Sequence, residues 1–104
     1  MIALQVAGLI ADFYLFLELT GDDDLDPDTA VKMTESLAYH LGEMDHAFLR
    51  ELVDAFAVVA ENYTDDEVRE TVRNIASDLY LEETLAGDDP VKLAELEALR
   101  DARA

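Results

Sequence analysis

The chain has 104 residues, of which 51% are hydrophobic, with no cysteine and a formal net charge of −18 at pH 7. This length suits a single domain, residues 1–104, and the hydrophobic content is sufficient for a core, so we do not expect charge-driven disorder. The absence of cysteine excludes disulfides, thiolate metal sites and cysteine nucleophiles. It also suits the reducing cytoplasm, where we expect the protein to act.

The acidic surplus restricts the class of partner. Twenty-five Asp and Glu stand against seven Lys and Arg, and Lys32 is the only Lys or Arg before Arg50. We expect neither nucleic acids nor anionic membranes as partners, because both are bound through Lys and Arg that neutralise phosphate. A cationic protein is the expected partner, although a large net charge also serves to keep a small protein dissolved.

The first predicted helix covers residues 3–19 and contains the longest apolar segment, residues 2–17. This segment is shorter than the roughly 20 apolar residues that cross a membrane, and Gln5, Gly8 and Asp12 interrupt it. No basic residue precedes it and no cleavage site follows it, as a signal peptide requires. We therefore expect a central, mostly buried helix and no membrane association.

Two further predicted helices each follow a residue suited to cap them. Asp26 suits the N-cap of a helix over residues 27–41, with Pro27 at its first position and Gly42 at its end. Asp45 suits the N-cap of a third helix, which continues to about Asn62. Apolar residues at helical spacing predict a buried face on both.

The remaining sequence predicts a fourth helix and a shorter last one. Residues 64–67, Thr-Asp-Asp-Glu, match a capping box and predict a helix to Leu79. Residues 80–89 have no clear pattern apart from a break at Gly87, and Asp89-Pro90 starts a last helix over residues 91–102. Its partly three-residue leucine spacing and charged flanks predict a peripheral or frayed helix. The fold class that follows is all-α, a compact bundle of four helices plus a shorter C-terminal helix.

Several motifs for metal binding or catalysis are incomplete. An EF-hand loop starting at Asp22 needs glycine at its sixth position, which is Pro27, and glutamate at its twelfth, which is methionine. Glu43 and His46 have the Glu-x-x-His spacing of di-iron helical proteins, but they straddle a predicted helix end and the motif occurs once. We expect no catalytic residue, metal site or cofactor. A small metal-binding helical protein that uses His40, His46 or Glu43 remains a less favoured alternative.

Helix capping accounts for only part of the acidic surplus. Seven acids lie at predicted helix starts, where they favour the helix dipole: Asp26, Asp28, Asp65, Asp66, Glu67, Asp88 and Asp89. Subtracting these 7 from 25 leaves 18 acids against seven basic residues. Several surround the connection after the first helix, and the tyrosines at 39, 63 and 80 are candidate aromatic anchors. The predicted partner-binding residues are Asp22, Asp23, Asp24, Glu35 and Tyr39.

Four segments carry a resemblance to a known group of proteins. They are FLELTGDDDLDPDTAV at residues 16–31, LRELVDAF at 49–56, AENY at 60–63 and VRETVRNI at 68–75. This pattern, over about residues 9–83, resembles the small acidic helical immunity proteins of bacterial polymorphic toxin systems. It is an overall pattern without an invariant motif, so no contact residue is carried over.

The resemblance implies a cytoplasmic inhibitor that binds and neutralises a toxin domain. Our leading hypothesis, from the acidic surface, is that it occludes a cationic active site. A nuclease is the favoured class of toxin, since an acidic surface can imitate the phosphates of its substrate. An acidic helical adaptor or structural protein is the alternative, and the sequence leaves the oligomeric state open.

Overall fold

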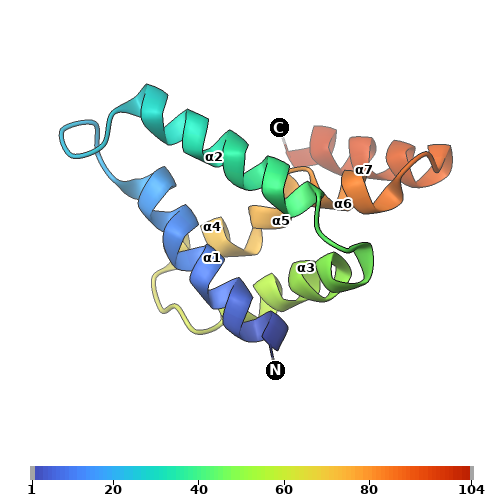
Figure 1. The fold of residues 1–104 in the computed structure, drawn as a ribbon, viewed down its shortest axis with the longest axis horizontal. Coiled ribbons are helices and arrows are strands. Elements are labelled where there is room, and N and C mark those ends of the chain that lie inside the picture. Colours follow the sequence, from blue (N-terminus) through green and yellow to red (C-terminus); the bar gives the residue numbers. More distant parts are fainter. Residues whose placement is uncertain (1, 104) are drawn as a thin grey trace.

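The computed structural model describes residues 2–103, and within this range the regular structure is helical throughout. The helices, in chain order, are α1 (Ile2–Leu19), α2 (Pro27–Gly42), α3 (His46–Ala60), α4 (Asp66–Arg73), α5 (Ile75–Asp78), α6 (Leu81–Ala86) and α7 (Pro90–Arg103) (Figure 1). The all-α class is therefore confirmed. The arrangement of four helices plus one is not confirmed, because three short helices occupy the stretch between residues 66 and 86.

The predicted cap residues hold the starts of three helices. Asp26, Asp45 and Asp89 each accept a hydrogen bond from a backbone N–H in the first turn of α2, α3 and α7. Pro27 is the first residue of α2 and Gly42 its last, as predicted. These ends are confirmed because they depend on local chemistry that the sequence carries directly.

The predicted continuous helix to Leu79 is wrong. Its cap is Asp65, one residue later than the predicted capping box starts, and Asp65 Oδ1 accepts from Val68 N at 3.0 Å. Asn74 separates α4 from α5, and Tyr80 separates α5 from α6. Tyr80 has φ 57°, a left-handed conformation that cannot continue a right-handed helix. This turn lets Leu81 enter the core, where it is fully buried.

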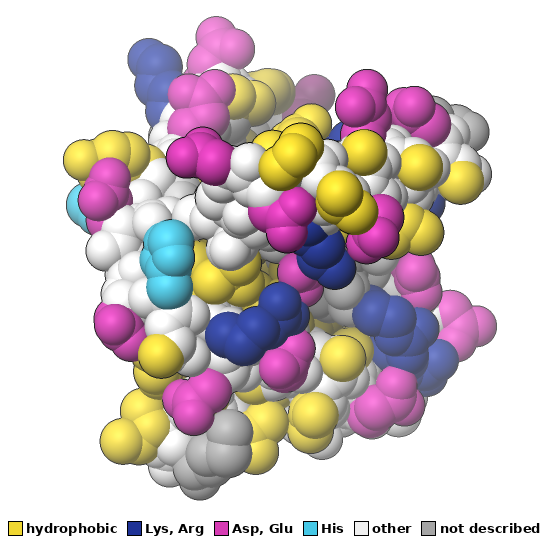
Figure 2. Space-filling view, turned by 90° about the vertical axis from the view of Figure 1, so that its right-hand side faces the viewer, with side chains coloured by type: hydrophobic (Ala, Val, Ile, Leu, Met, Phe, Trp, Pro, Cys, Tyr) yellow, Lys and Arg dark blue, Asp and Glu magenta, His cyan; other side chains and the backbone are white. Residues whose placement is uncertain are grey.

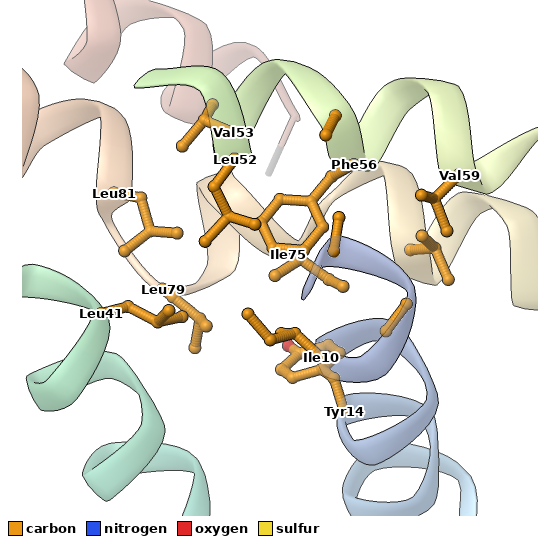
Figure 3. Close-up of a cluster of buried hydrophobic side chains, with 14 of the residues drawn as sticks. Ile10, Tyr14, Leu41, Leu52, Val53, Phe56, Val59, Ile75, Leu79 and Leu81 are labelled. Atoms are coloured by element: carbon orange, nitrogen blue, oxygen red, sulfur yellow. The ribbon is translucent and has the colours of Figure 1, made fainter. Parts of the chain in front are cut away.

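The core lies where α1 packs against α3 and the short helices close over both. Phe56 of α3 sits at its centre between Leu52 and Ile75, and Ile10 and Tyr14 of α1 approach from the other side (Figure 3). Buried alanines on α1 allow close approach to α3: Ala3, Ala7 and Ala11. Several chain segments far apart in sequence therefore share one apolar interior.

A polar contact lies at the edge of this core. The hydroxyl of Tyr14, which is almost fully buried, donates to Asp78 Oδ2 at 3.1 Å and so joins α1 to α5. Burial, followed by the charges of Asp78 and Glu18, raises the pKa of Tyr14 well above its ordinary value. The phenol therefore stays neutral and remains a hydrogen-bond donor.

The expectation that α1 is mostly buried is wrong. Only 33% of the helix is buried, because its outer face is apolar as well and is left uncovered. By length and composition alone α1 could cross a membrane, a test that core helices of soluble proteins also pass. The inner face of α1, which packs on α3, is part of the core described above.

Two helices extend from the core at the periphery. In α2 the one buried residue is Leu41, near its end, and in α7 none is buried. The molecule consequently measures 42 × 31 × 26 Å, with α2 and α7 along its upper side in Figure 1. The predicted peripheral position of the last helix is confirmed.

Candidate partner-binding groove between α1 and α2

The predicted contact region contains a groove of ≈ 290 Å³ at the junction of α1 and α2. We call its acidic lining residues Glu18, Asp22 and Glu35 the rim, and Thr20 and Thr34 also line it. We call its apolar lining residues the floor: Leu17, Leu25, Pro27, Ala30 and Val31. Its lining comes from the end of α1, the connection and the first half of α2, whose one buried residue, Leu41, lies near the other end of the helix (Figure 1). Apolar surface thus remains accessible beneath acidic side chains.

The structure brings together two of the five predicted contact residues and places the others beside them. Asp22 and Glu35 line the groove from the connection and from α2. Asp23 and Asp24 are exposed in the same connection, next to Asp22. Tyr39 lies one helical turn beyond Glu35 on α2 and is 64% exposed. The five are thus distributed along the connection and α2, and their role in binding remains a prediction.

The other two candidate tyrosines make contacts within the protein. The Tyr63 hydroxyl donates to Asp12 Oδ1 at 2.9 Å, and partial burial together with this hydrogen bond raises the pKa of Tyr63. The Tyr80 ring lies 3.8 Å from the guanidinium of Arg100. Tyr39 meets only the edge of the His40 ring, with centroids 5.4 Å apart. Of the three, Tyr39 is therefore the side chain best exposed to a partner.

Ion pairs are distributed unevenly along the chain. Every arginine pairs with a carboxylate, and all of these pairs lie between residues 50 and 103. Figure 2 shows Lys and Arg side chains among Asp and Glu on the side of the molecule that carries α7. Within described residues 2–49 there are ten Asp and Glu, one basic residue, Lys32, and no ion pair. Among the described residues the groove acids therefore form no ion pair, and Lys32 is the one Lys or Arg on α1 and α2.

The alternative of a metal site gains no support from side-chain positions. Among described residues, no group of three or more His, Asp or Glu is arranged to hold a metal ion. Glu43 follows the end of α2 and His46 is the first residue of α3, so the two do not share a helix. The groove instead presents an apolar floor with a negative rim, which complements an apolar strip flanked by Lys or Arg.

Sequence reasoning missed the floor of the groove. Leu25 and Val31 are apolar residues within an acidic stretch, and Val31 is largely exposed. We selected contact residues by charge and aromaticity, so these two were not included. The signal that could have found them is an apolar residue that lies outside the predicted buried faces of the first two helices.

Comparison with protein families, with curated proteins and with solved structures finds no match to this chain.

Proposed function

We propose that this chain is an immunity protein that binds a cationic toxin domain through the α1–α2 groove. The observation that carries the proposal is the separation of charge: the arginines pair with acids after residue 49, while the groove acids remain unpaired. Solubility depends on net charge and does not require such a separation. An accessible acidic rim over an apolar floor is the arrangement that a positively charged protein surface complements.

Each part of the groove has a distinct role in this proposal. The uncompensated acids around Asp22 and Glu35 attract the toxin and speed the encounter. Burial of Val31 and Leu25 beneath an apolar strip of the toxin slows dissociation, with Tyr39 as an aromatic anchor. A nuclease is the favoured target because its substrate cleft is positively charged, so the acidic rim occupies the position of phosphate and blocks access.

The proposal is tested with a matched pair of charge-reversal variants. D23K/D24K lies at the groove, while E95K/E97K changes two exposed acids on α7 that form no ion pair within the described chain. Two reversals of +2 each take the net charge from −18 to −14 in both variants. The measurement is the association rate with the toxin domain encoded by a neighbouring gene, by stopped flow over a series of salt concentrations.

We expect D23K/D24K to slow association by about tenfold or more and to reduce its dependence on salt. E95K/E97K should change the association rate by less than about threefold, because charges on α7, distant from the groove, act weakly through solvent. Equal slowing in both variants would place the contact region elsewhere. Co-expression tests the function itself: the chain must protect cells that produce the toxin domain, and cell death, or neighbouring genes without a toxin domain, would refute immunity.

A further inference from the structure

The outer face of α1 carries an apolar stripe that the described residues leave exposed except at Val6, which packs against the core cluster. It consists of Ile2, Val6, Leu9, Phe13 and Phe16, at successive spacings of four, three, four and three residues. Leu9 at its centre is 74% exposed, and Val6 is half-buried. A repeat of 3.5 residues places all five on one side of the helix, as at the seam of a coiled coil. The pattern therefore describes a helix with two apolar faces.

We propose that a second copy of this chain covers the stripe, with the two α1 helices packed antiparallel about a two-fold axis near Leu9. Four strongly exposed apolar side chains give on the order of 500 Å² of apolar surface per protomer, at the upper end of what a monomer leaves uncovered. A stable protein interface buries roughly 800 Å² per partner, so the stripe supplies more than half of the area that such a dimer needs. A self-complementary stripe is what a two-fold interface requires.

The charge around the stripe favours this occupant over a cationic protein. Between residues 2 and 17 the one charged side chain is Asp12, and its carboxylate already accepts the Tyr63 hydrogen bond. A cationic partner would thus gain little electrostatic attraction here, whereas pairing of two such faces adds only the two Asp12 charges to the repulsion between the acidic protomers. An anionic membrane is opposed by the net charge of −18.

The antiparallel direction follows from the position of the acidic connection. Asp22, Asp23 and Asp24 follow the C-terminal end of α1, an 18-residue helix that is about 27 Å long. Antiparallel packing puts the two acidic clusters at opposite ends of the interface. Their separation is then several times the Debye length, which is ~8 Å at physiological salt. It also places Phe13 and Phe16 against the aliphatic N-terminal end of the partner helix. Large side chains of one helix then face smaller side chains of the other along the whole interface.

This inference goes beyond the proposed function and does not depend on it. None of the stripe residues lines the α1–α2 groove. The dimer therefore carries two open grooves, one near each end of the paired helices. Salt has opposite effects on the two interfaces: it screens repulsion between the acidic protomers and strengthens the dimer, but it weakens attraction of a cationic toxin.

Oligomeric state measured by sedimentation equilibrium tests the proposal, with a matched pair of variants. Leu9→Glu places two carboxylates against each other on the axis, and Val91→Glu makes the same change on α7 at a position with similar exposure, 67%. The wild type and Val91→Glu should reach about twice the chain mass of 11.6 kDa, while Leu9→Glu remains monomeric with unchanged helicity. A monomeric wild type, or a Leu9→Glu variant that still dimerises, would overturn the proposal.

Single cysteines test the direction, because the sequence has no other cysteine. Leu9→Cys should form an intermolecular disulfide on mild oxidation, since residues on the axis approach within bonding range. Ile2→Cys should not, because antiparallel packing holds the two copies of residue 2 about 20 Å apart. Cross-linking of Ile2→Cys would refute the antiparallel arrangement. Leu9→Glu should bind the toxin domain as fast as the wild type, so failure of either proposal is recognised separately.

Discussion

The interior around Phe56 and the outer helix α7 are held to the molecule by different forces. Phe56 is 1% exposed and lies among apolar side chains from α1, α3 and α5. Helix α7 has no buried residue; its Arg100 donates to the Ser77 carbonyl and to Glu83 Oε2, both at 2.9 Å, and stacks on Tyr80. Apolar burial stabilises the whole domain, whereas these contacts stabilise the position of one helix.

The difference also explains where the arginines lie. Burial requires no charge, so the α1–α3 interior contains no ion pair among the described residues. Helix α7 buries no residue, and arginine contacts connect it to α6 and α6 to α3. This use of the scarce basic residues leaves the acidic α1–α2 end unneutralised.

The largest expected effect comes from the interior. Phe56→Ala removes a fully buried ring and should lower the free energy of unfolding by about 3–5 kcal/mol. Val58→Ala, two residues along α3 at a 57% exposed position, should change it by less than about 0.5 kcal/mol. Urea denaturation followed by circular dichroism measures both. Similar losses in the two variants would show that the interior is not centred on Phe56.

A smaller and local effect is expected at α7. Arg100→Ala should release the helix and speed hydrogen exchange of its backbone amides by roughly tenfold, from the lost charged hydrogen bonds and cation–π contact. Exchange in α1 and α3 should not change. Lys92→Ala, with the same charge change on the same helix, is the control and should leave α7 protected. Faster exchange throughout the molecule would mean that α7 is part of the global core.

The smallest effect is expected at the boundary between the two regions, where Arg50 of α3 binds Glu82 of α6 through two hydrogen bonds of 3.0 and 2.6 Å. The bond to Arg50 lowers the pKa of Glu82. The Glu82 carboxyl therefore binds a proton less tightly in the folded state than in the unfolded state. The stabilisation by the ion pair is complete above the ordinary Glu pKa of about 4.3 and is lost as pH falls through the lowered pKa.

Glu82→Gln should therefore cost less than about 1 kcal/mol at pH 7, as expected of a partly exposed pair. The difference from the wild type should disappear below the lowered pKa, where Glu82 is neutral in both folded and unfolded states. Urea midpoints at neutral and strongly acidic pH provide the measurement. A difference of equal size at both pH values would show that the carboxylate charge is not involved.

Much of the fold could be predicted because its causes are local. Asp26-Pro27 and Asp45 specify helix starts within a few residues, and apolar spacing in residues 49–60 specifies the buried face of α3. The candidate site was predicted in part: its acidic residues stand out by charge, and the structure gathers Asp22 and Glu35 around one groove. Its apolar floor depends on the angle between two helices, which no short segment encodes.

By itself, the sequence determined the all-α class, the helix starts, the acidic surplus and its concentration near residues 22–24, since composition and capping act over a few residues. Only the tertiary structure decided that Tyr80 turns the chain left-handed to bury Leu81, that α1 keeps an uncovered apolar face, and that the arginines pair away from the groove. These features depend on which surfaces meet across long separations in sequence. The energy of packing decides which surfaces meet, and the local helix propensity of each segment does not.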